Sequence, residues 1–415
     1  MLRSRSSKGK VVGSSVRVGT VLAASFFLLG SALFGSFAGS ASAAKAKTPF
    51  RVLNISAQSG GFAAYGQADK AALEAAATYL NGHGGILGHK VVIDTVNDNS
   101  DPATAVSVLQ EYLSNHPAPN DVYAGSESTE TQALFPLLGQ HNLLSLVGSS
   151  GFEQLETGQY PDIFSPLGPS TTALTSLVNY LQKQGYKSVG LLVEGLQFTS
   201  AELAPLQADL TQVGITSTVA NFDPTALDLT SEESQLQSAS PNALVVLAIS
   251  ASAGYALTAR AELNWSVPVI GDVAFGDTNL VSLVPAADLQ NVKAVIYGSS
   301  TYYPPSKLPH GIATLEKYIK PYSNSTISSL PIVTIGRSWD GLMAIAAAAK
   351  QANSIKTSAI ANALRHFKDT TDPLFAVFPE IGWAGANHEN VLTSIADYPV
   401  VPAGAIVNGL VKPAS

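Results

Sequence analysis

The stretch Arg51-Val-Leu-Asn-Ile-Ser-Ala-Gln-Ser-Gly-Gly-Phe-Ala-Ala-Tyr-Gly66 decides the fold, because a β-rich run passes through a glycine-rich turn into an Ala-rich segment that ends at Asn81. In that segment apolar residues recur at helical spacing, at Ala68, Ala72, Ala75, Ala76, Tyr79 and Leu80. A second glycine-rich turn, 82–88, leads into another β-rich run, 90–97. This βαβ order predicts a right-handed crossover in a parallel sheet.

The same alternation continues through most of the chain. Further strands are expected at 121–124, 143–147, 188–193, 215–220, 243–249, 267–270 and 292–297. Helices are expected from Asp101-Pro102 onward and at 200–213, 253–264, 311–322 and 336–352, the last with Asp340 as a helix-start acid. A chain of 415 residues with this pattern can bury substantial cores and split into two α/β domains with parallel sheets.

The first 43 residues predict an export signal. Arg3, Arg5, Lys8, Lys10 and Arg17 precede an apolar run, 21–38, and the small residues 41–43 form a cleavage site. We expect cleavage between Ala43 and Ala44, which would place the mature protein outside the cytoplasm. An uncleaved membrane anchor is the alternative, because the apolar run approaches spanning length.

Composition excludes several classes of function. The first 43 residues hold five of the 23 basic residues and no acid, so the remainder carries 18 bases against 30 acids, a formal net charge of −12. An exported acidic domain of this kind is a poor partner for nucleic acid. The chain contains no cysteine, which excludes disulfides, thiolate metal sites and a cysteine nucleophile.

Motifs for catalysis or cofactor binding are also absent from the sequence. His388-Glu389 lacks a second histidine at helical spacing, and Gly148-Ser-Ser-Gly151 is one residue shorter than a nucleophile elbow. The run 82–85 follows a helix instead of opening one, unlike a dinucleotide-binding loop. We therefore expect no enzyme activity and no cofactor, with a secreted hydrolase as the disfavoured alternative.

Three segments in order resemble the extracytoplasmic solute-binding receptors of the branched-chain amino acid type, which serve ABC importers. They are Ser59-Gly-Gly-Phe-Ala-Ala-Tyr-Gly66, Leu80-Asn-Gly-His-Gly-Gly-Ile-Leu-Gly88 and Asp98-Asn-Ser-Asp-Pro102. The resemblance implies a periplasmic-binding-protein-like type I fold, an α/β fold of two doubly wound parallel-sheet (Rossmann-like) domains. Two lobes would be joined by a three-crossing hinge, with a ligand cleft at the carboxyl ends of both sheets. It implies an N-terminal lobe of 48–166 plus 299–375 and a C-terminal lobe of 167–298 plus 376–415.

On the first lobe, the resemblance places Tyr65 over the ligand, although this ring could instead pack the turn onto the helix. It assigns the ligand's carboxylate to Ser126, Glu127 and Ser128 together with the next turn, Val147, Gly148 and Ser149. Free N–H groups and hydroxyls at a helix start suit such a group. Ser128 could also be an ordinary N-cap. Glu127 would repel an anion if it faced the cleft, so either it points outward or the ligand is not anionic there.

On the second lobe, the resemblance points to three positions that follow strands. Phe198 stands where a ligand-contacting tyrosine is frequent, with core packing as the alternative. Ser250 is small where amino-acid binders present a tyrosine, which predicts a roomier pocket. Asp272 could meet a ligand ammonium or cap a loop.

These observations predict the substrate-binding component of an ABC importer, which captures an amino acid, an amide or a related small polar solute by hinge closure. The expected partners are the ligand and the permease and ATPase subunits. A lipid anchor is excluded, because it needs a cysteine. A receptor that senses a ligand for a signalling partner, without transport, is the other alternative.

Overall fold

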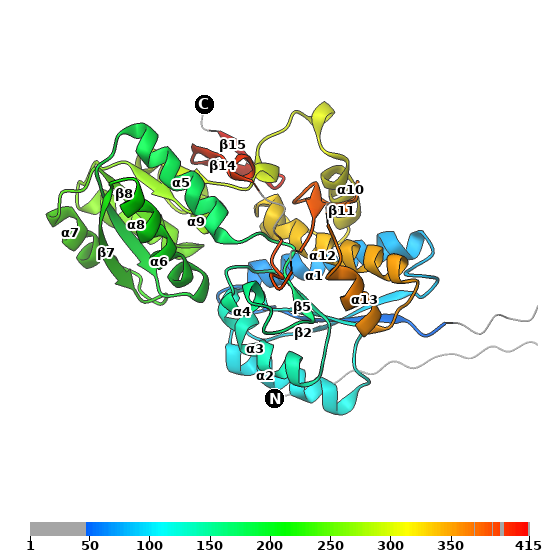
Figure 1. Ribbon diagram of the computed structural model, residues 1–415. Coiled ribbons are helices and arrows are strands. Elements are labelled where there is room, and N and C mark those ends of the chain that lie inside the picture. The colour runs from blue at the N-terminus through cyan, green and yellow to red at the C-terminus, as the bar shows by residue number, and fades with distance from the viewer. Residues whose placement is uncertain (1–46, 369, 384, 391–393, 414–415) are drawn as a thin grey trace, which may run out of the picture. The chain divides into compact units, whose positions relative to one another are not determined.

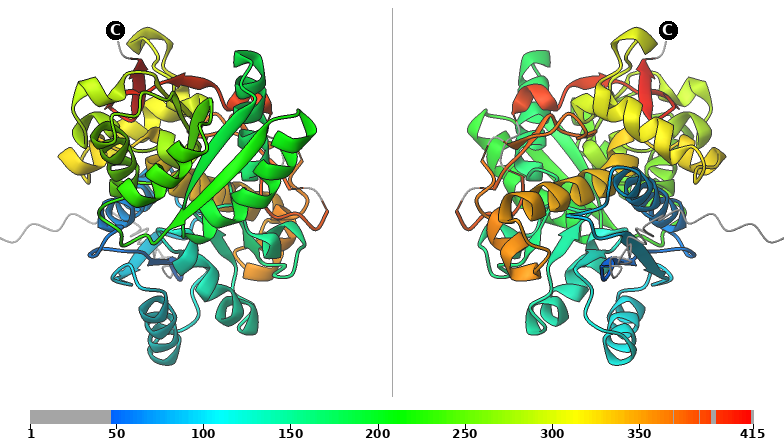
Figure 2. Two further views of the ribbon diagram at one scale, coloured as in Figure 1. Left: turned by 90° about the vertical axis from the view of Figure 1, so that its left-hand side faces the viewer. Right: turned by 90° about the vertical axis from the view of Figure 1, so that its right-hand side faces the viewer.

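The computed structural model describes residues 47–413, except 369, 384 and 391–393. The predicted export signal lies outside the described residues. Two largely parallel sheets, each covered by helices, make up the described chain (Figures 1 and 2), and this confirms the predicted fold class. Within these described ranges, no helix is both long enough and apolar enough to span a bilayer.

The first sheet has the order β2-β1-β3-β4-β5, and all of its neighbouring strands are parallel. The side chains of β1 point alternately to the two faces of the sheet. On one face, Phe50 and Val52 pack in the core beneath α1, α10, α12 and α13. On the other face, Leu53 and Ile55 pack in the core beneath α2 and α3. The strands are β1 (Phe50–Ile55), β2 (Val91–Val96), β3 (Asp121–Ala124), β4 (Ser145–Val147) and β5 (Ile163–Phe164). The helices are α1 (Ala63–Gly82), α2 (Pro102–Asn115), α3 (Ser128–Gln140), α4 (Glu153–Glu156), α10 (His310–Ile319), α11 (Ser325–Ser328), α12 (Ile332–Ala352) and α13 (Thr357–Leu364).

The second sheet has the order β13-β10-β9-β8-β6-β7, and only β13 runs antiparallel to its neighbour. Its faces pack on α5 and α6 and on α7 and α8. The strands are β6 (Ser188–Glu194), β7 (Thr216–Phe222), β8 (Ala243–Leu247), β9 (Val269–Gly271), β10 (Val292–Val295) and β13 (Val400–Pro402). The helices are α5 (Ser170–Gln184), α6 (Gln197–Gln212), α7 (Thr230–Ser238), α8 (Ala251–Glu262) and α9 (Val273–Gly276).

Short elements complete the described chain. Two small hairpins pair β11 (Thr370–Thr371) with β12 (Glu380–Ile381) and β14 (Gly404–Val407) with β15 (Leu410–Pro413). The single 3₁₀ turns are η1 (Leu280–Ser282), η2 (Ala286–Leu289), η3 (Gly298–Ser300), η4 (Pro305–Lys307) and η5 (Ile395–Asp397).

The sequence prediction was wrong about helices near the C-terminus. Helix α12 begins at Ile332, one turn earlier than predicted, because Pro331 takes the position before the first helical residue. Asp340 therefore lies inside the helix, fully buried, and its carboxylate accepts hydrogen bonds from Ala376 N (2.6 Å) and Val377 N (2.8 Å). Helix α13 was not predicted, although its buried Ile360, Ala361 and Leu364 have helical spacing.

Helices α1 and α12 lie side by side on the first sheet and are joined by a buried ion pair (Figure 2). Arg337 Nη2 of α12 lies 3.0 Å from Asp69 Oδ2 of α1, and Arg337 Nε donates to Asp69 Oδ1 (3.2 Å). The hydroxyl of Tyr123 on β3 also donates to Asp69 Oδ1 (2.8 Å). Burial raises the pKa of Asp69, but the charge of Arg337 and these donors oppose that rise and favour the carboxylate.

The chain passes from the first sheet to the second between β5 and α5. The predicted limits of the lobes stay a prediction, and one group of contacts crosses them. Residues 380–383 and 385–390, assigned by sequence to the C-terminal lobe, return to the first sheet: Ser165 N donates to His388 O (2.8 Å) and Phe152 N donates to Glu389 Oε1 (2.9 Å). Trp383 joins the core beneath α12.

Two buried acids lie together in the second half of the fold. Asp272 caps α9 through its Oδ1, which accepts from Phe275 N (2.8 Å), and Glu202 of α6 is fully buried near it. Burial raises the pKa of Glu202 well above its usual range, and the charge of Asp272 raises it further. Burial also raises the pKa of Asp272 to about 7.

The ion pair between α1 and α12 gives a first prediction. We expect Arg337→Met to destabilise the fold by about 3–5 kcal/mol, because it leaves Asp69 as an uncompensated buried charge. The double variant Arg337→Met, Asp69→Asn should recover part of that loss. Urea unfolding measures both.

The matched control is Arg365→Met, which breaks a half-exposed ion pair with Asp162 (2.8 Å) and should cost no more than about 1 kcal/mol. An Arg337→Met protein as stable as the Arg365→Met protein would contradict the structural role of the buried pair.

The buried acids give a second prediction, for pH dependence. A carboxyl whose pKa is higher folded than unfolded (about 4.3 for Glu) holds its proton better in the folded state. It therefore favours folding at low pH, and that advantage is lost as the pH rises through the folded pKa. We expect Glu202→Gln to be more stable than wild type at about pH 8, and to lose less stability than wild type between about pH 5 and pH 8.

The free energy of unfolding at both pH values checks this. Glu262→Gln, which removes an exposed acid at the end of α8, should follow the wild-type curve. If Glu202→Gln retained the wild-type pH slope, the assignment of raised pKa values to these acids would be incorrect.

Candidate functional site

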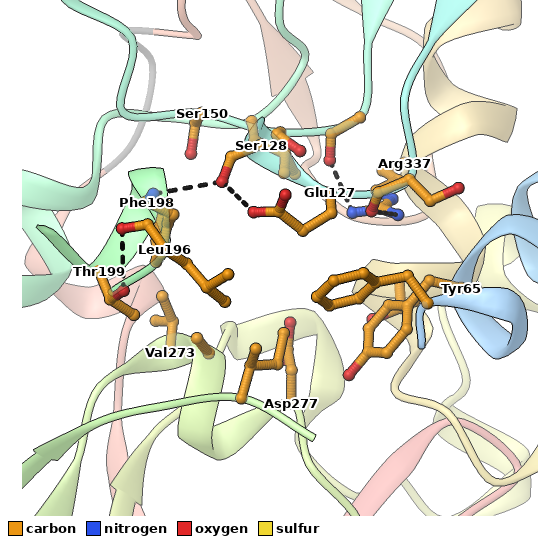
Figure 3. Close-up of a pocket in the computed structure, with 18 of the residues that line it drawn as sticks. Tyr65, Glu127, Ser128, Ser150, Leu196, Phe198, Thr199, Val273, Asp277 and Arg337 are labelled. Carbon is orange, nitrogen blue, oxygen red and sulfur yellow. Dashed lines mark hydrogen bonds between the residues drawn. The ribbon is translucent and has the colours of Figure 1, made fainter. Parts of the chain in front are cut away.

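One cavity lies where loops that follow strands of both sheets meet (Figure 3). It contains about 650 Å³ of empty space, including the solvent at its open mouth. Parallel sheets place ligands at the carboxyl ends of their strands, as here. The lining residues are Phe62, Tyr65, Ser126, Glu127, Ser128, Gly148, Ser149, Ser150, Leu167, Leu196, Phe198, Thr199, Ile249, Val273, Ala274, Asp277, Tyr297, Thr334 and Arg337.

The structure brings most of the sequence-predicted site residues to this cavity. The residues in the lining are Tyr65, Ser126, Glu127, Ser128, Gly148, Ser149 and Phe198. The residues outside it are Val147, Ser250 and Asp272. Their contact with a ligand stays a prediction.

The turn between β3 and α3 is fixed by internal hydrogen bonds. Gly125 has φ +73°, and an added Cβ there would lie 2.1 Å from Thr131 Oγ1, so only glycine fits. Ser126 Oγ accepts from Ala57 N (2.9 Å), which ties this turn to the one after β1. The turn therefore reaches the cavity already ordered.

Glu127, and not Ser128, caps helix α3, which corrects the sequence prediction. Its Oε2 accepts from Thr129 N (2.7 Å), and Ser128 Oγ donates to its Oε1. Ser128 is the first helical residue. Glu127 lines the cavity (Figure 3), so of the two options that the sequence left for this residue, an outward orientation is excluded.

The turn after β4 packs against the ion pair of α1 and α12. The carbonyl of Gly148 accepts from Arg337 Nη1 (2.8 Å), and an added Cβ at Gly148 would lie 2.0 Å from the hydroxyl of Tyr123. Ser149 O accepts from Ser165 Oγ (2.7 Å). Arg337 therefore holds this turn as well as the helix that it comes from.

The second-sheet side of the cavity begins with the first turn of α6. Phe198 lies in this helix, not in a loop as predicted, and its ring is partly exposed in the cavity. Its backbone N donates to Ser128 Oγ (3.2 Å), and Gln197 Nε2 donates to Gly151 O (3.0 Å). Direct hydrogen bonds thus connect the first turn of α6, which follows a strand of the second sheet, with Ser128 and Gly151, which follow strands of the first sheet.

Two residues predicted for the site on this side, Asp272 and Ser250, make hydrogen bonds within the protein instead of lining the cavity. Asp272 is buried and caps α9, which is the alternative that the sequence left open for it. Ser250 precedes α8 with φ +58°, and its N donates to Thr278 Oγ1 (2.9 Å). The acid that does line the cavity is Asp277, at the end of α9.

Sequence reasoning missed several lining residues. Leu196, Thr199 and Ile249 follow the ends of β6 and β8, so the strand-end rule could have found them. No such signal exists for Thr334 and Arg337, since they come from a helix about 200 residues after β3 in the chain.

Charge in the cavity is unevenly distributed. Glu127 and Asp277 lie on opposite sides (Figure 3), and Arg337 is the one cation among the described lining residues. Burial raises the pKa of Asp277 well above its usual range, and the charge of Arg337 lowers it only in part. Burial and the charge of Asp277 raise the pKa of Tyr65, which therefore keeps its hydroxyl proton.

The arrangement can enclose one small molecule between hydroxyl-bearing turns and aromatic rings. Most of its exposed lining is apolar, with serine and threonine hydroxyls among the apolar and aromatic side chains. Among the described residues, no group of three or more His, Cys, Asp or Glu could hold a metal ion.

Solved structures show the same fold. The LivJ branched-chain amino acid binding protein of Streptococcus pneumoniae, in complex with isoleucine, is 18% identical, with a TM-score of 0.72 over 89% of this chain and 99% of that one. A solute-binding protein of an ABC transporter from Rhodopseudomonas palustris, in complex with 3,4-dihydroxy benzoic acid, is 19% identical, with a TM-score of 0.69 over 82% and 90%. A fatty acid ABC transporter substrate-binding protein from Thermomonospora curvata is 13% identical, with a TM-score of 0.70 over 89% and 92%.

The sequence itself matches a family profile described as "Periplasmic binding protein" over residues 49–395. No curated protein sequence matches the chain significantly. The matched residues include both sheets except β13, and the cavity lining lies entirely within them. The chain therefore belongs to the periplasmic binding protein family, with the type I fold and the resemblance to Leu/Ile/Val receptors that its opening βαβ unit predicts.

Proposed function

We propose that this protein captures a small solute outside the cytoplasmic membrane and delivers it to the permease and ATPase subunits of an ABC importer. The observation that carries the proposal is the cavity, because its lining comes from strand-end loops of both sheets. A solute in it would contact both halves of the fold at once. The solved relatives named above bind different solutes, so the family leaves the ligand class open.

The proposed mechanism is closure around the solute. The two sides of the cavity already meet at the first turn of α6: Phe198 N donates to Ser128 Oγ, and Gln197 Nε2 donates to Gly151 O. A ligand that adds contacts to both sides favours the arrangement in which these loops are together, and so shifts the population toward it. A micromolar dissociation constant requires about 8 kcal/mol, which several hydrogen bonds and one buried aromatic contact can supply.

We infer binding without catalysis. The hydroxyls of Ser126 and Ser128 accept hydrogen bonds from the backbone N–H groups of Ala57 and Phe198, so their oxygens hold loops in place. A serine nucleophile would instead keep its oxygen free for the substrate, next to a general base.

Truncation of one lining side chain tests solute capture. We expect Phe198→Ala to weaken binding of the solute by roughly tenfold or more, because the ring lines the cavity. The ring also packs against the core of the second sheet, so the empty variant should lose some stability but stay folded. Thermal unfolding against a library of amino acids, amides, ureas, amines and aromatic and fatty acids finds the solute, since a ligand of the native state raises stability by mass action. Titration calorimetry then gives the affinities.

Leu227→Ala is the matched control, since this apolar side chain is 73% exposed and lies outside the cavity. Small-angle X-ray scattering with saturating solute should show a smaller radius of gyration. A solute that binds the Phe198→Ala protein as tightly as wild type, with no change in scattering, would rule out capture by closure on this cavity.

A further inference from the structure

The described lining of the cavity holds two acids, Glu127 and Asp277, and one arginine, Arg337, whose charge is balanced by Asp69. Glu127 approaches from the start of α3 and Asp277 from the end of α9, on opposite sides (Figure 3). A ligand enclosed here would therefore lie between two carboxyl groups, one on the first-sheet side of the cavity and one on the second-sheet side.

The guanidinium of Arg337 already has partners within the protein for most of its N–H groups. It forms an ion pair with Asp69, and it donates four hydrogen bonds: two to Asp69, one to Gly148 O and one to Ser126 O. An arginine has five N–H groups, so one remains for a ligand. With its charge balanced by Asp69, Arg337 is a weak partner for a ligand carboxylate.

The helix start that could attract an anion is also occupied. The carboxylate of Glu127 accepts from Thr129 N and from Ser128 Oγ, and its charge already complements the dipole of α3. A ligand carboxylate placed here would have to approach Glu127 directly, where the two negative charges repel each other.

On the opposite side, Asp277 is half-buried, and one of its two carboxylate oxygens has an unmet need for a donor within the described chain. Its Oδ1 is buried without a hydrogen-bond partner among the described residues. An unpartnered buried carboxylate is costly, which is why burial raises the pKa of this group. An ammonium or amidinium group would supply the missing donor, and its positive charge would favour the ionised form of Asp277.

Aromatic rings complete this environment. Phe62 and Tyr65 meet edge to face with their centroids 6.1 Å apart, and Phe198 and Tyr297 also line the cavity. Ring faces attract organic cations and pack against apolar groups.

We infer that this cavity takes an organic cation without a free carboxylate, namely an amine or amidine with an apolar or aromatic body. The inference rests on the proposed function, solute capture, and names the ligand class for that cavity. The cationic group would lie between Glu127 and Asp277, and the body would pack against the rings.

Two matched series of probes test the charge preference. The first is isopentylamine, isovaleramide, isovalerate and leucine, and the second is phenethylamine, hydrocinnamamide, hydrocinnamate and phenylalanine. Within each series the apolar body is similar and the charge differs. We expect the amine to bind roughly tenfold or more tightly than the carboxylate and the amino acid, since charged hydrogen bonds exceed neutral ones by this order. Calorimetry at low salt measures each affinity.

A variant of Asp277 links that preference to this acid. Asp277→Asn should lose roughly tenfold or more in amine affinity and bind the amide as well as wild type does, because the amide carries no charge to pair. It should fold normally, since Oδ1 of Asp277 has no hydrogen bond to lose among the described residues. Glu262→Gln, the loss of an exposed acid outside the cavity, should leave every affinity unchanged.

The outcomes separate this inference from the proposed function. Carboxylate or amino acid binding as tight as that of the amine overturns the inference and leaves solute capture standing. If neither series binds while another compound class of the wider library does, the ligand class is wrong and capture again stands. If no compound of either set stabilises the protein, both proposals fail.

Discussion

The buried ion pair of Asp69 and Arg337 is the interaction on which the first half of the site depends. A charge pair removed from water is stable only if further hydrogen bonds satisfy it. Here the remaining donors and acceptors are the turns after β3 and β4 and the hydroxyl of Tyr123 on the sheet. The requirement to satisfy one guanidinium therefore fixes two helices, one strand and two binding turns in a single arrangement.

Several other polar groups of the lining are likewise satisfied by hydrogen bonds within the protein. Backbone N–H groups of the same and neighbouring turns donate hydrogen bonds to the side-chain oxygens of Ser126, Glu127 and Ser128. Such groups are ordered before a ligand arrives, which reduces the entropy lost on binding. Asp277 is the exception, with a buried oxygen that has no partner among the described residues. A group that the protein leaves unsatisfied inside a cavity is where a ligand gains most.

This distribution of charge distinguishes the chain from what its family resemblance implies. The resemblance assigns a ligand carboxylate to the turn of Ser126 and Ser128. In this chain the protein's own carboxylate, that of Glu127, occupies that helix start. Membership of the family thus accounts for the two sheets and the position of the cavity, whereas side chains particular to this sequence set what the cavity can hold.

The sequence by itself determined the α/β class, most strands and the turns that reach the cavity, because period-two and helical patterns and glycine-rich turns are local signals. Seven predicted residues, from Tyr65 to Phe198, line one cavity for this reason: they follow strand ends, and parallel strands end at one edge. Only the tertiary structure decided that Arg337 reaches the same cavity, that Asp277 lines it in place of Asp272, and that Asp340 is buried inside α12. These facts depend on contacts between segments far apart in the chain, and such contacts leave no local pattern in a single sequence.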